Sequence, residues 1–299
     1  MAEARTVHVK ALAKINLSLR VLYKRADNYH ELRTVFQTIS LSDEITLIYQ
    51  PARITEVTVE CTVPIENNLA VKAAHAVLEA AKAHGKVHLI LEKRIPMGGG
   101  LGGGSTDAAA VLLALSALMR RPLPKEKLAE LAATLGSDVP FFLIGGTVLG
   151  MGRGEELYPF PQPDTSYGIL LTPEIHVSTA EAYQSLGRTL TQVSGVGFAM
   201  ESWGIGEGAS LEQWRRFCAN DFEEPVFARH PELGELRNRM EAAGAIIARM
   251  TGSGAAIFGL FPSRSHAVEA ASLFPDTPNV LFRTVDKRQY DRQWGKILS

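Results

Sequence analysis

The 299-residue chain has only two cysteines, Cys61 and Cys218, and they lie far apart in the sequence. Two isolated cysteines provide neither a disulfide framework nor the ligand spacing of a zinc site, and they are typical of a reducing compartment. The longest apolar run, residues 139–151, is interrupted by one proline and three glycines and is too short to cross a bilayer. No apolar segment of the secretory kind follows the first residues. We therefore expect a cytoplasmic protein without a membrane partner.

Net charge is also nearly absent, at −1 from 31 basic and 32 acidic residues. This balance gives no electrostatic reason to bind nucleic acid, and we expect none. A hydrophobic fraction of 46% and a charged fraction of 21% are ordinary for a globular protein, and the length allows one large or two moderate domains. Three prolines in residues 159–163 form a stiff link. We place a boundary there, between a domain at 1–158 and a domain at 159–299.

Glycine, in contrast, is concentrated in one loop, where residues 98–104 hold six glycines in seven positions. The loop leads into an apolar helical pattern, with Ser105 or Thr106 as the expected N-cap and Asp107 in the first turn. Bare backbone can approach a ligand closely, and a helix N-terminus presents free N–H groups to an anion. The segment is therefore a predicted phosphate site. A flexible linker is the alternative, but linkers do not lead into a capped apolar helix.

Two familiar phosphate-binding loops fit this segment poorly. A Walker A loop requires lysine where Ser105 stands. A dinucleotide fingerprint requires a strand that ends at the glycines, whereas residues 92–96 separate the predicted strand 87–91 from the loop. Both readings are weak.

The remaining patterns mix strands and helices without regular alternation. Residues 7–22 alternate, with Ala13 and Ile15 on one face and Lys14 and Asn16 on the other. Further strands are expected at 31–41, 43–49, 54–63, 87–91, 168–172, 245–250, 255–261 and 279–285, helices at 68–84, 105–119, 125–135, 178–186, 231–243 and 265–274, and a loop at 192–210. This mixture favours an α+β fold over a doubly wound one.

Five segments, taken in this order, resemble the GHMP kinases. They are Ala-Lys-Ile-Asn-Leu at 13–17, Arg-Ala-Asp-Asn-Tyr-His-Glu at 25–31, the glycine loop at 96–107, Leu-Gly-Ser-Asp-Val-Pro at 135–140 and Met-Thr-Gly-Ser-Gly-Ala at 250–255. The second segment, together with Asn-Asp-Phe-Glu at 220–223, is similar to the branch of the family whose substrate carries a cytidine diphosphate group. The family usually has glycine at the position of Asn28, and asparagine is the next most tolerant residue at positive φ.

This resemblance covers nearly the whole chain, and it implies a two-domain α+β fold with the active site in the cleft between the domains. It implies ATP as co-substrate, with Mg²⁺ expected, no metal held by a dedicated cluster of side chains, and a small cytidine-diphosphate-linked molecule as the substrate. The residues it places at the nucleotide are Pro96, Met97, Gly98, Gly99, Gly100, Leu101, Gly102, Gly103, Gly104, Ser105, Thr106, Asn68 and Lys93. The residues it places at the substrate are Asn16, Tyr29, His30, Thr179 and Tyr183.

The resemblance also assigns the catalytic pair, Asp138 as the base and Lys14 as the cation that steadies the phosphoryl charge. From the residues alone, Asp138 fits a helix N-cap equally well, and Lys14 fits a solvated strand lysine. Residues 251–254 are expected to form a turn that supports the glycine loop. Tyr29 and His30 suit stacking on a base and hydrogen bonding to its edge, although a structural hairpin would also explain them.

Three alternative functions remain open. Another kinase of the same family, acting on homoserine or mevalonate, is the nearest, but neither substrate carries a base for Tyr29 and His30. A nucleotide-dependent oxidoreductase would bind or consume NAD(P)H. A nucleotide-binding module without catalysis would leave Asp138 and Lys14 without a purpose.

Overall fold

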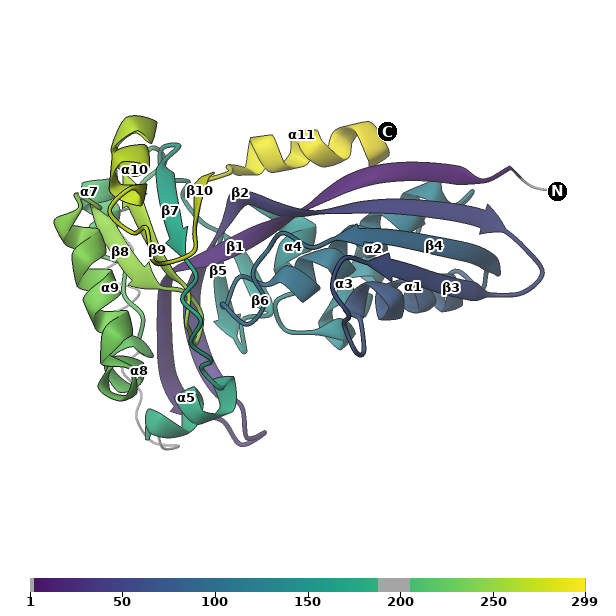
Figure 1. Cartoon of the computed structure of the whole chain (residues 1–299). Coiled ribbons are helices and arrows are strands. Elements are labelled where there is room, and N and C mark those ends of the chain that lie inside the picture. The colour runs from purple at the N-terminus through teal and green to yellow at the C-terminus, as the bar shows by residue number, and fades with distance from the viewer. Residues whose placement is uncertain (1–2, 188–204, 299) are drawn as a thin grey trace.

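The computed structural model describes residues 3–187 and 205–298 of the chain. Most of the loop expected at 192–210 therefore lies outside the described residues. The described part contains helices and strands in comparable amounts and forms two antiparallel or mixed sheets, so the prediction of an α+β fold is confirmed (Figure 1). None of its helices combines the length and the apolar character that a bilayer crossing demands.

Two long strands, β1 (Arg5–Lys24) and β2 (His30–Pro51), run through the molecule and pair antiparallel along their length (Figure 1). The prediction of two strands at 31–41 and 43–49 is wrong, because Ser42 and Asp43 stay in the ladder opposite Leu12 and Ala11. The first part of β2 also pairs with β5 and its last part with β4. The other strands of this sheet are β3 (Glu56–Cys61), β4 (Gly85–Glu92), β5 (Thr147–Gly152) and β6 (Glu156–Pro159).

Helices cover one face of this sheet, namely α1 (Leu69–Ala80), α2 (Gly103–Leu118), α3 (Lys125–Leu135) and α4 (Phe141–Ile144) (Figure 1). Residues 106–116 of α2 are all buried, which explains why this helix is apolar on every side. Helix α1 ends at Ala80 rather than at the predicted residue 84, since Lys82 adopts a left-handed φ of 47° and Gly85 already begins β4.

The predicted N-cap of α2 is also wrong. The helix begins two residues earlier than Ser105, with Gly102 as its N-cap at φ 71° and no side-chain cap. Because Gly103 and Gly104 already have helical geometry, Ser105 and Thr106 lie inside the first turns and Thr106 is buried.

The second sheet has the order β10-β7-β9-β8. Its strands are β7 (Tyr167–Leu171), β8 (Ile247–Met250), β9 (Ile257–Phe261) and β10 (Asn279–Arg283). The helices of this part are α5 (Thr179–Ser185), α7 (Leu211–Arg215), α8 (Glu223–Arg229), α9 (Pro231–Ala242) and α10 (Arg264–Ala271). Ser178 caps α5 through a hydrogen bond from Glu181, as its sequence predicts.

The last helix, α11 (Lys287–Leu298), was not expected from the sequence. It returns to the first sheet, where Tyr290 and Trp294 are buried among the residues that pack on α2 (Figure 1). Pro159 ends β6 and Tyr167 begins the second sheet, so the chain changes sheets after the proline-rich segment. The division into 1–158 and 159–299 stays a prediction, and α11 packs on the first part.

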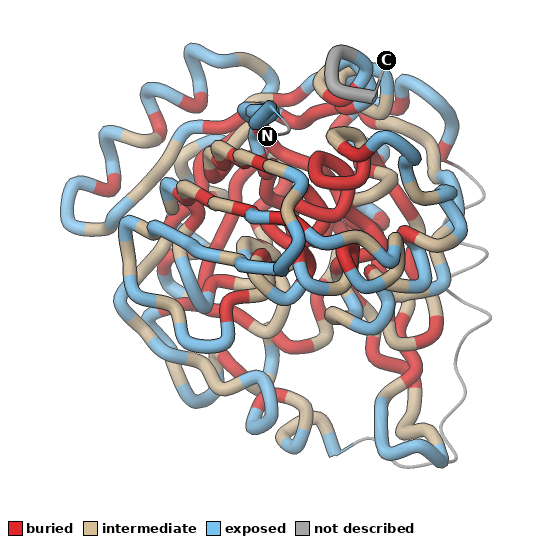
Figure 2. Tube along the Cα trace, turned by 90° about the vertical axis from the view of Figure 1, so that its right-hand side faces the viewer, coloured by how far each residue is buried: buried red, intermediate tan, exposed pale blue. Residues whose placement is uncertain are grey.

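Buried residues fill the interior and form three hydrophobic clusters (Figure 2). Strand β1 contributes to all three clusters, with Val9 in the first, Ile15 in the second and Leu19 in the third. The alternating face that carries Lys14 and Asn16 therefore passes through the middle of the molecule rather than over its surface, and both side chains are buried.

Candidate active site

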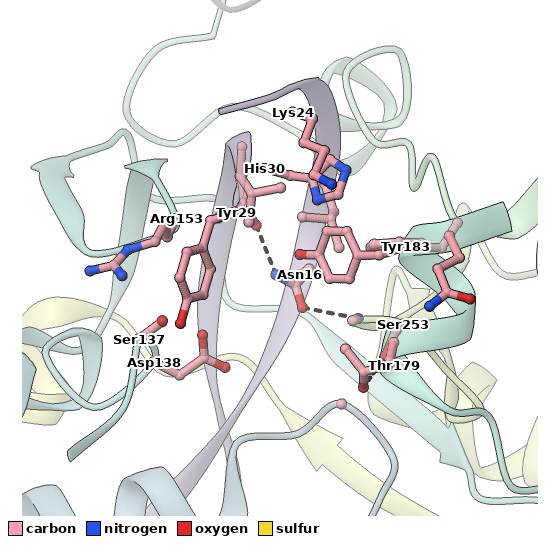
Figure 3. Close-up of a pocket in the computed structure, with 18 of the residues that line it drawn as sticks. Asn16, Lys24, Tyr29, His30, Ser137, Asp138, Arg153, Thr179, Tyr183 and Ser253 are labelled. Atoms are coloured by element: carbon pink, nitrogen blue, oxygen red, sulfur yellow. Dashed lines mark hydrogen bonds between the residues drawn. The ribbon is translucent and has the colours of Figure 1, made fainter. Parts of the chain in front are cut away.

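A cleft with a volume of about 820 Å³ opens beside the second half of β1 and the first part of β2 (Figure 3). Its walls come from both parts of the molecule. The first sheet and its helices contribute β1, the turn before β2, Gly100 and Ser137–Asp138, and the second part contributes α5, Phe222 and the turn at Gly252–Ser253. Segments far apart in the sequence thus converge on one cavity.

The predicted catalytic pair meets in this cleft. Lys14 Nζ lies 3.5 Å from Asp138 Oδ2. The lysine side chain is only 4% exposed, whereas that of Asp138 is 34% exposed, so a buried cation faces a carboxylate that a substrate can reach. Asp138 stands in the turn between α3 and α4. The reading of Lys14 as a solvated strand residue is wrong, because β1 is covered on both faces.

Asn16 connects Lys14 to the turn at 251–254. Its Oδ1 accepts hydrogen bonds from Lys14 Nζ at 2.7 Å, from Gly252 N at 3.0 Å and from Thr251 Oγ1 at 3.2 Å. Its Nδ2 donates to Thr34 Oγ1 at 2.7 Å. The amide is buried, and its hydrogen bonds join the Lys14 ammonium to the 251–252 turn and to β2. Its contact with substrate stays a prediction.

The glycine loop packs directly against these elements. Leu101 O accepts a 3.1 Å hydrogen bond from Lys14 N, and Gly100, at φ 74°, lies so close to the Thr251 carbonyl that a Cβ there would collide with it. The expected contact between the 251–254 turn and the loop is therefore present. This contact fixes the position of the glycine loop relative to Lys14.

Three other residues predicted to hold the nucleotide, Asn68, Met97 and Lys93, lie around the glycine loop and differ in exposure. Asn68 caps α1 through a 2.9 Å hydrogen bond from Ala70 N, and Met97 is largely exposed at the edge of the loop. Lys93 is buried with its Nζ on the carboxylates of Asp43 and Asp107, the latter at 2.6 Å. That ammonium is already paired, and Lys93 N donates to Thr62 Oγ1 at 3.0 Å, so a contact between Lys93 and the nucleotide stays a prediction.

All five predicted substrate residues line the cleft. The His30 and Tyr183 rings stack with centroids 4.8 Å apart, and Tyr29 stands across from them beside Asp138 (Figure 3). Tyr29 is exposed, and the Arg153 guanidinium lies 4.7 Å from its ring centroid. Asn28 adopts φ 68°, so the asparagine keeps the turn that the family usually makes with glycine. Thr179 Oγ1 is 2.9 Å from Ser253 Oγ at the cleft edge.

Burial sets the charge of two of these rings. It lowers the pKa of His30, and the nearby Lys24 charge lowers it further, so the imidazole is neutral at pH 7 and offers one donor and one acceptor. Burial, with the Asp138 charge, raises the pKa of Tyr183 to about 12. The stacking wall therefore carries no charge of its own.

Among the residues of the cleft wall that sequence reasoning missed are Arg153, Phe222 and Ser253. Phe222 and Ser253 stood inside segments that the resemblance had singled out, but a motif does not show which of its side chains faces a cavity. Arg153 lies in a glycine-rich turn between β5 and β6 and had no signal beyond its charge.

Comparison with known proteins agrees with this geometry. The GHMP kinase N-terminal domain matches residues 68–146, and the GHMP kinase C-terminal domain matches residues 204–276. The chain therefore belongs to the GHMP kinases, and it is an ATP-dependent small-molecule kinase. Membership in a kinase family argues against the two alternatives of another class, a nucleotide-dependent oxidoreductase and a nucleotide-binding module without catalysis.

Among its relatives is a 4-diphosphocytidyl-2-C-methyl-D-erythritol kinase of Solibacter usitatus, 44% identical over 307 aligned residues, which cover all of this chain and 95% of the relative. A protein of the same name from Gloeobacter violaceus is 39% identical and covers 92% of each chain. A crystal structure of 4-(cytidine 5′-diphospho)-2C-methyl-D-erythritol kinase superposes with a TM-score of 0.77 at 38% identity, over 93% of this chain and 99% of the other. A homoserine kinase of Cytophaga hutchinsonii, at 18% identity and a TM-score of 0.70, shares the fold.

We expect Gly102→Ala to weaken ATP binding. Its φ of 71° costs an L-residue about 1–2 kcal/mol, and the added Cβ would lie 2.7 Å from the Phe142 ring. The loop must therefore move. Gly244→Ala is the matched control, because Gly244 has φ 94°, open space around it and no contact with the loop. Calorimetry should show weaker ATP binding for Gly102→Ala alone, and equal affinities in two folded variants would contradict the assignment.

Proposed function

We propose that this kinase transfers the γ-phosphoryl group of ATP to the 2-hydroxyl of 4-(cytidine 5′-diphospho)-2-C-methyl-D-erythritol. The observation that carries the proposal is one cleft with Lys14 and Asp138 at its floor and the rings of Tyr29, His30 and Tyr183 on its walls. The first pair suits phosphoryl transfer, and the rings suit a nucleobase. The names and high coverage of the relatives support the same substrate.

In this proposal Asp138 accepts the proton of the substrate 2-hydroxyl while the hydroxyl oxygen bonds to the γ-phosphorus. The bond between that phosphorus and the β,γ-bridging oxygen breaks, and ADP leaves. Lys14, whose Nζ lies 3.5 Å from Asp138 Oδ2, neutralises charge on the transferring group. The loop around Gly102 and the N-terminus of α2 hold the ATP phosphates.

Mg²⁺ fits the donors of this site. It prefers oxygen ligands and keeps several waters, and it is bound mainly through nucleotide phosphates with one or two protein oxygens. The half-buried Ser105 in the first turn of α2 and the part-exposed carboxylate of Asp138 offer such oxygens. When bound, the ion would neutralise charge on the β- and γ-phosphates.

The deciding experiment is ADP release measured with the diphosphocytidyl substrate, homoserine and mevalonate in parallel. We expect turnover with the first and background rates with the other two. Faster turnover with homoserine would replace the proposed substrate while leaving the family assignment intact.

We expect Tyr29→Ala to raise the KM for the cytidyl substrate, because it removes one stacking face worth about 1–3 kcal/mol. Tyr29 is exposed on the cleft, so the fold should tolerate the change. The KM for ATP should stay the same. If ATP affinity falls instead and the substrate KM does not move, Tyr29 belongs to the nucleotide side.

A further inference from the structure

The segment Asn220–Glu223, which runs from the loop after α7 to the first residue of α8, contacts three different walls of the cleft. The function described so far uses none of its residues. Asn220 Nδ2 donates to Met250 O at 2.7 Å and to Gly252 O at 2.9 Å, and Glu223 Oε1 accepts from Met250 N at 2.8 Å. Asn220 Oδ1 accepts from Phe222 N at 2.9 Å, which fixes the segment itself.

These bonds reach the catalytic lysine through a short chain of contacts. Asn220 and Glu223 hold the backbone on both sides of Thr251. Thr251 and Gly252 donate to Asn16 Oδ1, which accepts from the Lys14 ammonium. The residues of this chain of contacts are buried or nearly buried. A buried hydrogen-bond network whose groups are all paired holds its side chains in one conformation.

The middle of the segment holds the end of β1. Asp221 Oδ2 accepts from Val21 N at 3.0 Å, and Asp221 Oδ1 pairs with Arg20 at 3.0 Å. The backbone adds bonds from Leu19 N to Ala219 O and from Asp221 N to Leu19 O. The strand leads from here into the turn that presents Tyr29 and His30.

Phe222 reaches the third wall. Its ring is 1% exposed, lines the cleft and meets the Tyr183 ring edge to face, with centroids 4.8 Å apart and an interplanar angle of 82°. Tyr183 also stacks on the His30 ring. Edge-to-face packing is one of the two arrangements that aromatic pairs prefer, so Phe222 helps to fix the plane of the ring that a base would stack on.

From this geometry we propose that Asn220–Glu223 is a positioning element for substrate recognition, in which Phe222 orients Tyr183 for the cytosine and Asn220 aligns Lys14 through the 251–252 turn. The part played by Phe222 rests on the proposed cytidyl substrate. Neither residue takes part in the chemistry itself.

The test compares Phe222→Leu with Phe274→Leu. Phe274 is also 1% exposed and belongs to the same core cluster, but it does not line the cleft. Both variants should lose similar stability. Only Phe222→Leu should raise the KM for the cytidyl substrate, by about threefold to tenfold for one aromatic pair, with the KM for ATP unchanged. Equal KM values in the two variants would overturn the proposal.

Coupling to Tyr183 gives a second readout that a merely structural role would not move. In a Tyr183→Ala background, Phe222→Leu should add little to the KM, because its partner is already gone. Independent, multiplicative effects would overturn the proposal. Calorimetry with cytidine 5′-diphosphate separates the two levels. If the wild-type enzyme does not bind cytidine 5′-diphosphate, the proposed substrate is wrong. If the wild type and Phe222→Leu bind it equally well, only the positioning role of Phe222 is wrong.

Discussion

Replacing Asp138 by asparagine is expected to lower kcat by about 10²–10⁴-fold, the usual contribution of a positioned general base. Asparagine keeps the shape of the side chain but cannot take the proton of the attacking hydroxyl. The Asp138 side chain is 34% exposed in a turn, so the fold should survive the exchange. Single-turnover rates with the cytidyl substrate, together with circular dichroism, measure the effect.

Lys14→Met provides the second half of this experiment. The apolar stem keeps most of the buried volume over the Phe36 ring, while the charge that faces Asp138 is lost. In the proposed mechanism both residues act on one proton transfer and one developing charge, so their losses should not multiply in the double variant. Near-wild-type turnover of a folded Asp138→Asn enzyme would refute the base, and fully multiplicative losses would separate the two roles.

Local signals in the sequence predicted the elements that depend on local chemistry. Gly136 ends α3, Ser178 caps α5, and Asn28 takes the positive φ that its turn requires. Helix α11 was missed although Tyr290 and Trp294 stand four residues apart, which is the spacing of one helix face. Both side chains are buried against the helical layer of the first sheet, and Gln293 Nε2 donates to Lys10 O.

The candidate site shows the same division. Alternation in β1 predicted that Lys14 and Asn16 share a face, and the structure agrees through their 2.7 Å hydrogen bond. It did not predict that this face is buried, because the elements that cover it come from residues more than 80 positions away, such as the loop at Leu101 and the turn at Thr251. Such distant partners leave no periodic trace in the strand itself.

Lys93 is the clearest example of a role that the sequence could not show. The resemblance placed it at the nucleotide, but its ammonium lies between two carboxylates from β2 and α2. Asp43 also accepts from the backbone N–H groups of Arg94 at 2.5 Å and Ile95 at 2.8 Å. The cluster of Asp43, Lys93 and Asp107 therefore ties the chain entering the glycine loop to the helix that leaves it.

Burial dominates the titration of this cluster. It raises the pKa of Asp107 to about 7, with the neighbouring Asp43 charge adding to the rise and the Lys93 charge opposing it. A carboxyl whose pKa is higher in the folded than in the unfolded chain binds more protons in the native state between about pH 4 and pH 7. Its contribution to stability therefore falls as the pH rises through this window.

Lys93→Met is accordingly expected to destabilise the fold by about 3–5 kcal/mol near neutral pH, because it removes the counter-charge that two buried carboxyl groups share. Loss of the lysine must raise the pKa of Asp107 further. The free energy of unfolding of the Lys93→Met variant should therefore lie further below the wild-type value at about pH 8 than at about pH 5.5. Lys127→Met, which breaks the exposed pair with Glu130, is the matched control and should change little at either pH. Urea unfolding of the three proteins at both pH values measures these differences. A deficit for Lys93→Met that is small, or that does not grow with pH, would show that the cluster does not hold the glycine loop through its charges.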